Sequence, residues 1–273
     1  MKAEDFPFAV ELANTMNWDM TSEDFRFNRQ LEPKGCFTLF SDAERVGVAT
    51  CISYESLGWF GNLIVKPQAR GKGAGTLLVE HAVQYLKSKG AKTVGLYAYP
   101  HLLDFYGRLG FKPDVEFTVL RTKTLHFKGK PPARKAEKTD FGAIVQLDDE
   151  CFGAPRKKLL RQILANQTKI CHVLHENNVL SGFVAAEVYE DVAEVGPLVC
   201  RRASAERAVT LLESAFAELQ GLEAWMCLPT AETALVKSAL SAGFREAFRV
   251  VRMFLGSAAA LDCVYVAESL ERG

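Results

Sequence analysis

Between residues 61 and 90 the chain changes from one hydrophobic pattern to another. The apolar run from Gly61 to Val65 stops at Pro67, as a buried strand does at a turn. Further on, apolar residues follow the three-and-four spacing of one face of an amphipathic helix, and Lys89-Gly90 supplies the glycine that commonly ends a helix. Three glycines at alternate positions separate the two patterns. The sequence therefore predicts a strand, a tight glycine loop and a helix.

The glycine loop has the features of a phosphate-binding turn. Backbone N–H groups at a helix start have no intrahelical partners and lie at the positive end of the helix dipole, which favours a bound phosphate. Glycine lets the backbone adopt unusual dihedrals or come within contact distance of a ligand. A turn whose glycines serve only the chain reversal is the alternative. The residues expected to hold a phosphate or pyrophosphate are Arg70, Gly71, Lys72, Gly73, Ala74, Gly75 and Thr76.

The glycine spacing distinguishes three classes of phosphate site. A dinucleotide site needs Gly-x-Gly-x-x-Gly, and an ATP-type P-loop needs Gly-x-x-x-x-Gly-Lys-Ser/Thr; this loop matches neither. The run Arg70-x-x-Gly73-x-Gly75 resembles the Gln/Arg-x-x-Gly-x-Gly/Ala signature of the GNAT N-acetyltransferases, which binds the pyrophosphate of acetyl-CoA. The resemblance implies acetyl-CoA as cosubstrate, with its pantetheine arm bonded to the preceding strand as an added strand would be. The strand residues expected to bind it are Leu63, Ile64 and Val65.

A second segment extends this resemblance. Thr93 to Tyr99 has the pattern of a strand, and positions 105–111 read Phe-Tyr-Gly-Arg-Leu-Gly-Phe. This resembles the GNAT segment in which a tyrosine near the CoA sulfur protonates the leaving thiolate, and the match falls on Tyr106. A neutral phenol with a pKa of about 10 can protonate a thiolate whose thiol has a pKa of about 8.5. The alternative for Tyr106 is a core aromatic between two phenylalanines.

The chain repeats weakly at a nearly constant offset. Asp-Phe at positions 5–6 recurs at 140–141, and Thr-Leu-Leu at 76–78 recurs at 210–212. Such a repeat predicts two tandem units. With the resemblance above, it implies an α/β protein made of two tandem GNAT folds, each a twisted mixed β-sheet flanked by helices. The first unit is expected at 1–128, a charged and proline-bearing linker at 129–138, and the second unit at 139–273.

The second unit lacks the residues that carry the expected chemistry in the first. In the repeat, the glycine loop aligns with Ser204 to Val209, which contains no glycine and brings Glu206 toward the phosphate position. Tyr106 aligns with Ala239, which cannot donate a proton. We expect the second unit to keep the fold without the acetyl-CoA chemistry; a second active site with different ligands is the alternative.

The stretches 147–153 and 195–199 resemble the C-terminal domain of the YitH-type tandem acetyltransferases, in which an intact GNAT domain precedes a diverged one. The resemblance implies an acetyl-CoA-dependent N-acetyltransferase that acts on a primary amine by direct attack in a ternary complex. The alternative is a non-catalytic CoA-binding sensor or interaction module. A small-molecule acceptor is expected, while its identity, the acyl-chain preference and the oligomeric state stay open.

The strand before the glycine loop carries no acidic residue that could take a proton from the amine. Asn62 could orient a water, and Glu55 or His101 could reach the site, although each also fits an ordinary surface position. Trp18 and the aromatic pair at 59–60 could line an acceptor pocket or fill the core. The general base is therefore left unassigned by the sequence.

Charge and cysteine content limit the class of protein. The chain has 33 Lys and Arg and 33 Asp and Glu, so no net basic field favours nucleic acid or an anionic membrane as partner. The sequence opens without a signal-like apolar run and contains no stretch that could span a bilayer, which predicts a cytoplasmic protein. Seven scattered cysteines without Cys-x-x-Cys spacing predict neither a disulfide framework nor a metal site.

Overall fold

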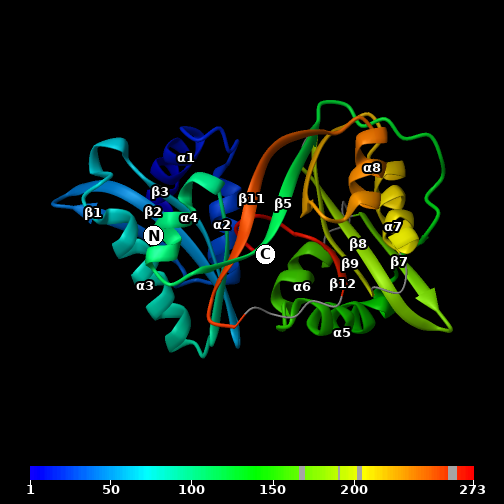
Figure 1. Ribbon diagram of the computed structural model, residues 1–273, viewed down its shortest axis with the longest axis horizontal. Helices are drawn as coiled ribbons and strands as arrows, with labels where there is room; N and C mark the ends of the chain where they lie inside the picture. Colours follow the sequence, from blue (N-terminus) through cyan, green and yellow to red (C-terminus); the bar gives the residue numbers. More distant parts are fainter. Residues whose placement is uncertain (166–169, 190, 202–204, 258–262) are drawn as a thin grey trace.

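The computed structural model describes the chain except residues 166–169, 190, 202–204 and 258–262 (Figure 1). The first half contains α1 (Phe6–Asn14), α2 (Ser22–Leu31), β1 (Cys36–Ser41), β2 (Glu44–Tyr54), β3 (Leu57–Val65), α3 (Ala74–Ser88), β4 (Thr93–Ala98), α4 (Leu103–Arg108) and β5 (Lys112–Thr122). The second half contains β6 (Arg134–Lys135), α5 (Phe141–Phe152), α6 (Lys157–Ala165), β7 (Ile170–Glu176), β8 (Val179–Tyr189), β9 (Val192–Arg201), α7 (Ala205–Glu218), β10 (Glu223–Pro229), α8 (Thr233–Ser241), β11 (Arg245–Leu255) and β12 (Cys263–Val266).

The predicted strand, loop and helix correspond to β3, the residues after it and α3. Helix α3 begins at Ala74, directly after Gly73, whose φ of +84° turns the chain into the helix. The order of elements from β1 to β5 is repeated from β7 to β11, as the sequence repeat predicts. The segment expected as a linker, 129–138, contains β6, which pairs with β7.

The two units share one sheet because each donates a strand to the other. The order of strands along the sheet is β1-β2-β3-β4-β11-β5-β10-β9-β8-β7-β6. Strand β11, from the second half, lies between β4 and β5 of the first half and is antiparallel to both. Strand β5, from the first half, pairs in turn with β10 of the second half. The two sheets expected from the sequence are thus continuous through this exchange, at the centre of Figure 1.

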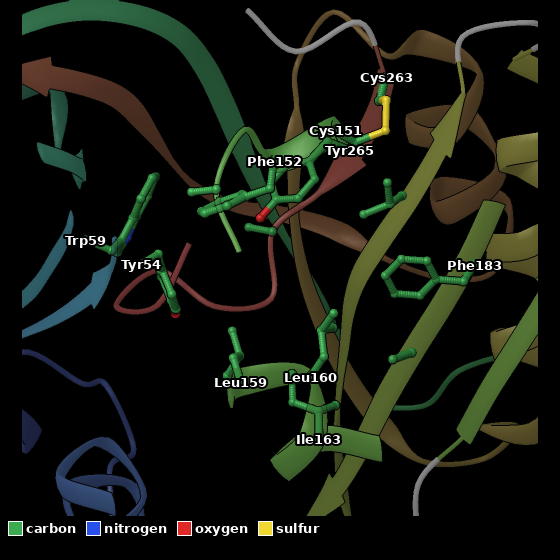
Figure 2. Close-up of a cluster of buried hydrophobic side chains, with 14 of the residues drawn as sticks. Tyr54, Trp59, Cys151, Phe152, Leu159, Leu160, Ile163, Phe183, Cys263 and Tyr265 are labelled. Atoms are coloured by element: carbon green, nitrogen blue, oxygen red, sulfur yellow. A yellow bond between two sulfur atoms is a disulfide. The ribbon is translucent and has the colours of Figure 1, made fainter. Parts of the chain in front are cut away.

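Helices cover both faces of the sheet. In the first half α3 and α4 pack with Phe60, Leu96 and Met253 on the outer face, and in the second half α7 and α8 pack with Leu198 and Met226. Helices α5 and α6 lie between the halves, where their apolar side chains meet side chains of β2, β3 and β8 in one cluster (Figure 2). Within the described part of the chain, no helix combines the length and hydropathy that crossing a bilayer requires.

The prediction of no disulfide is wrong at one pair of cysteines. A disulfide joins Cys151 of α5 to Cys263 of β12 (Figure 2), while the other five cysteines are free and buried. The paired residues are 112 positions apart in the sequence, so their spacing gives no sign of the bond. They meet because β12 returns alongside the sheet next to α5. Among the described residues, no group of three or more His, Cys, Asp or Glu side chains could hold a metal ion.

Candidate active site

A gap between β3 and β4 forms the centre of the candidate site. These parallel strands pair only from Leu57–Thr93 to Trp59–Gly95. Beyond that point β3 has a bulge opposite β2, where Asn62 has a φ of +51° and the register shifts. A parallel ladder that ends within a strand leaves the next N–H and C=O groups on that edge available to another extended chain. The stretch concerned contains the predicted pantetheine-binding residues Leu63, Ile64 and Val65.

The glycine loop follows β3 after a single 3₁₀ turn, Pro67–Ala69. Gly71 and Gly73 have φ values of +72° and +84°, and a Cβ at either position would have no atom within 4 Å. Packing therefore does not require glycine there, whereas the left-handed backbone does. Arg70 ties the loop to the strand, because its Nε donates a hydrogen bond of 2.9 Å to the carbonyl oxygen of Val65. Lys72 is exposed.

The start of α3 has no side-chain cap. The first hydrogen bond of the helix runs from the N–H of Leu77 to the carbonyl oxygen of Gly73, at 3.0 Å. The N–H groups of Ala74, Gly75 and Thr76 come before it, at the positive end of the helix dipole. The loop and helix start therefore bring several main-chain donors next to open space, which suits an anionic group.

Tyr106 lies on α4, close to the same end of α3. The tyrosine is only 5% exposed and contacts Phe105 and Phe111 edge-on. Burial raises the pKa of its hydroxyl above the ordinary value for tyrosine, so the phenol stays protonated at neutral pH. Its neighbour Phe105 lies against the loop, 3.4 Å from where a Cβ on Gly75 would be. The structure thus brings Tyr106 and the glycine loop to one end of the sheet.

The corresponding gap in the second unit is filled by the chain itself. Strands β9 and β10 also pair over only three residues, from Glu223–Val192 to Trp225–Glu194. Beyond this point β12 lies antiparallel to β9, from Cys263–Arg201 to Val266–Leu198. Strand β12 therefore occupies the edge of β9 that corresponds to the open edge of β3. Of the predicted 204–209 stretch, Ser204 lies outside the described residues, and α7 begins at Ala205.

Of the three side chains considered for taking up the proton of the amine, directly or through a water, Asn62 is engaged elsewhere and Glu55 lies too far away. Asn62 is buried, and its side-chain amide donates a hydrogen bond of 3.2 Å to Oγ1 of Thr50. Glu55 lies in the turn before β3, at the opposite end of the strand from the bulge. His101 is exposed and stacks on Tyr99.

The two tryptophans considered for the acceptor pocket differ in their surroundings. Trp18 is partly buried in the α1–α2 connection, and its Nε1 donates a hydrogen bond of 3.0 Å to the hydroxyl of Tyr99, at the end of β4. Trp59 is 1% exposed and packs against Tyr97, Phe152 and other aromatic rings. Trp59 therefore fills the core, and Trp18 borders the open end of the gap.

A segment that the sequence did not single out covers the inner face of β3. After β12 the chain continues as residues 267–273 between the two halves (Figures 1 and 2). Trp59 Nε1 donates a hydrogen bond of 3.3 Å to the carbonyl oxygen of Leu270, and the hydroxyl of Tyr54 donates one of 2.9 Å to that of Arg272. Arg156, on the other side, reaches the main-chain oxygen of Gly273 at 2.5 Å. The 267–273 segment is therefore a bonded part of the interior.

The 267–273 segment concentrates buried charge beside β3. Arg272 is 2% exposed; its Nε lies 2.8 Å from a carboxylate oxygen of Glu268, and its Nη1 lies 2.6 Å from one of Glu271. Glu194 of β9 approaches the same guanidinium at 3.9 Å. Burial raises the pKa of Glu194 well above its ordinary value, and that of Glu271 is raised for the same reason.

Two sequence profiles of known families match the chain. One is described as "Acetyltransferase (GNAT) family" and matches residues 5–111; the other is described as "Acetyltransferase (GNAT) domain" and matches residues 144–263. Over 53 residues the chain is 38% identical to serotonin N-acetyltransferase 2, chloroplastic, of Oryza sativa subsp. japonica. That match covers 19% of the chain and 26% of the rice protein, so the chain spans about a quarter of that relative's length.

Solved structures resemble the chain over nearly its whole length. A putative acetyltransferase from Pyrococcus horikoshii superposes with a TM-score of 0.80 at 20% identity, covering 100% of this chain and 94% of that one. A tandem GNAT protein from the clavulanic acid biosynthesis pathway superposes with a TM-score of 0.62 at 14% identity, covering 95% of this chain and 98% of that one. At these identities the likeness concerns the fold of both units together.

Proposed function

The chain belongs to the GNAT acetyltransferase family as a tandem of two units, and we propose that its first unit transfers the acetyl group of acetyl-CoA to a primary amine. Membership of this family implies acyl transfer from an acyl-CoA. The observation that supports the first unit as the reacting one is the contrast between the two gaps. The gap beside β3 is bordered by an uncapped, glycine-rich helix start, and the gap beside β9 contains β12.

Each part of acetyl-CoA has a counterpart in the first unit. The main-chain N–H groups of residues 70–76 bind the pyrophosphate, since the open space at Gly71 and Gly73 lets phosphate oxygens come close to the backbone. The free edge of β3 bonds the pantetheine amides as an added strand. One N–H group at the bulge polarises the thioester carbonyl.

The transfer proceeds by direct attack of the neutral amine on the thioester carbon. The C–N bond forms, the C–S bond breaks, and the leaving sulfur takes the phenolic proton of Tyr106. Burial keeps that proton on the phenol until the thiolate appears. Holding both reactants together supplies most of the acceleration, because a bimolecular step becomes effectively unimolecular. No covalent acyl-enzyme is needed.

Calorimetric titration with acetyl-CoA tests this proposal. We expect the unaltered chain to bind one equivalent and the Gly73→Glu variant to bind none, because the new side chain occupies the phosphate position. Gly221→Glu is the matched control: Gly221 also has a positive φ, of +88°, and no atom within 4 Å of its Cβ position, but it lies in the second unit. The control should therefore carry the same backbone strain and retain binding.

The stoichiometry decides which unit binds. Two equivalents would show that the second gap also accepts acetyl-CoA despite β12. No binding by the unaltered chain would overturn the proposed activity. Once binding is found, release of free CoA in the presence of a panel of primary amines measures turnover; an absence of turnover with every amine would favour a protein that binds CoA without catalysis.

A further inference from the structure

An acid approaches the bulge of β3 from the far end of the chain. A Cβ on Gly61 would lie 2.5 Å from both Cα and Cβ of Glu271 in the 267–273 segment. Such a separation is shorter than any real contact, so only glycine at position 61 allows the two backbones to lie this close. Gly61 immediately precedes Asn62, the bulge residue. Glu271 therefore lies where β3 turns away from β4.

Hydrogen bonds fix Glu271 at this place. Residues 270–272 form a turn whose apex is Glu271, and the turn is held both from within and by β2 and β3. A carboxylate carried on a bonded turn keeps its position better than one on a free loop, as a catalytic group must. The bonds are those from Arg272 N to Ser269 Oγ (3.1 Å), Gly273 N to Ser269 O (3.2 Å), Tyr54 Oη to Arg272 O (2.9 Å) and Trp59 Nε1 to Leu270 O (3.3 Å).

The gap is within reach of this side chain. Gly61 is two residues from Leu63, a separation of at most about 7 Å even in a fully extended strand. The Glu271 side chain keeps 15% of its surface exposed, so it is not sealed in the interior. A small amine that enters beside the bulge can therefore meet both the free edge of β3 and the carboxylate.

The surroundings of Glu271 increase the affinity of its carboxylate for a proton. Burial is the largest influence and raises its pKa, and the like charges of Glu268 on the same segment and Asp24 on α2 act in the same direction. Arg272 opposes them, but it is shared with Glu268 and with Glu194 of β9. A base works best when its pKa lies near the working pH, and an ordinary exposed glutamate is too acidic for that.

We propose that Glu271 is the general base of the acetyl transfer, supplied to the first unit by the 267–273 segment. This inference rests on the proposed function. As the amine nitrogen forms its bond to the thioester carbon, its proton passes to a carboxylate oxygen of Glu271, directly or through one water. The C–S bond breaks and the sulfur takes the proton of Tyr106. Glu271 then loses its proton to solvent and Tyr106 regains one, which restores both groups.

Four proteins test the role: the unaltered chain and the variants Glu271→Gln, Glu271→Asp and Glu268→Gln. Each is assayed with acetyl-CoA and the amine that gives the highest turnover in the panel. Glu268→Gln is the control for the ion-pair cluster, since both carboxylate oxygens of Glu268 accept from Nε of Arg272 (3.1 and 2.8 Å). Binding of acetyl-CoA and thermal unfolding are measured on all four.

We expect Glu271→Gln to lower kcat/KM about 100-fold, within the range of general-base catalysis. Acetyl-CoA affinity should be unchanged, and Glu271→Asp should regain part of the rate. The unaltered chain should show an acidic limb in its kcat/KM–pH profile, and Glu271→Gln should lose it. Glu268→Gln should keep its rate within about threefold and keep the limb, moved to lower pH because a like charge that raises the Glu271 pKa is gone. A merely structural role of the cluster would not allow this result.

Different results overturn different claims. If the unaltered chain turns over and folded Glu271→Gln stays within threefold of its rate, Glu271 is not the base, and the proposed acetyl transfer stands. Glu271 would also be excluded as the base if Glu271→Gln and Glu268→Gln lowered kcat/KM equally and both kept the acidic limb of the pH profile. Absence of turnover by the unaltered chain overturns the proposed activity and the role of Glu271 with it.

Discussion

Separating the two units should unfold the first, because a strand of the second completes its sheet. A fragment of residues 1–128 keeps the glycine loop and Tyr106 but loses β11, which lies between β4 and β5. The β4 ladder that it loses runs from Val251–Ala98 to Leu255–Val94. One edge of β4 and both edges of β5, which also loses β10, would then be unpaired, and unpaired sheet edges promote aggregation.

The stability that fragment 1–128 loses can be worked out from the buried side chains of β11. Val250, Met253 and Phe254 are each 1–3% exposed and pack in the clusters that contain Trp59 and Phe111. Burying one such side chain contributes about 1.5–3 kcal/mol, so the three together contribute about 5–9 kcal/mol. The net stability of a domain is about 5–15 kcal/mol. The fragment also loses the 267–273 segment that covers Trp59, and we expect it not to fold.

Circular dichroism and thermal unfolding of three preparations check this expectation. These are fragment 1–128 alone, fragments 1–128 and 129–273 produced together, and the full chain cut once between residues 128 and 129 by an inserted protease site. The first should show no cooperative transition. The other two should unfold cooperatively and bind acetyl-CoA, since the cut lies outside every helix and strand. A cooperative transition and acetyl-CoA binding by fragment 1–128 alone would refute the reasoning.

Three further expectations follow from single sites. Tyr106→Phe should lower kcat for acetyl transfer about 100-fold and leave the acetyl-CoA Kd unchanged; equal kcat values would exclude the tyrosine as the acid. Arg156→Met should lower the free energy of unfolding in urea by about 3–5 kcal/mol, because it leaves the fully buried Asp148 carboxylate unpaired. The double variant Arg156→Met with Asp148→Asn should lose clearly less free energy than the two single variants added together. Glu194 has a raised pKa in the folded protein, so its contribution to stability is present at low pH and falls as the pH rises above the ordinary pKa of glutamate. Glu194→Gln should therefore flatten the decrease in the free energy of unfolding between pH 5 and 8. An unchanged slope would contradict this.

The glycine loop and its helix were predictable because their signals are local. The φ values of Gly71 and Gly73 and the uncapped start of α3 depend on residues within one short stretch, and this stretch can be identified in the sequence. The repeat likewise predicts the order of elements in both halves. The roles of individual residues in the loop and of Tyr106 in the reaction stay predictions until binding and turnover are measured.

The exchange of β5 and β11 was not predictable from the pattern of either strand. Both are strands of 11 residues that mix apolar and charged positions, and such a pattern is compatible with any neighbouring strand of suitable register. Their pairing joins Arg121 to Arg245, residues far apart in the chain. Glu271 was missed for a similar reason. Beside Arg272 it has the composition of a solvated segment, and only the return of the chain after β12 brings it against β3.

The closed gap of the second unit and the missing acid of the first are connected by one stretch of chain. Gly196 of β9 and Gly61 of β3 each lie two residues after the end of the parallel ladder of their strand, and the 267–273 segment passes close to both. A Cβ on Gly196 would lie 2.0 Å from the carbonyl oxygen of Ala267, four residues before Glu271. Because β12 enters the gap where an acyl-CoA would otherwise add to β9, the residues after it emerge facing β3. The path that brings Glu271 to the first unit therefore requires β12 to fill the gap beside β9 in the second unit.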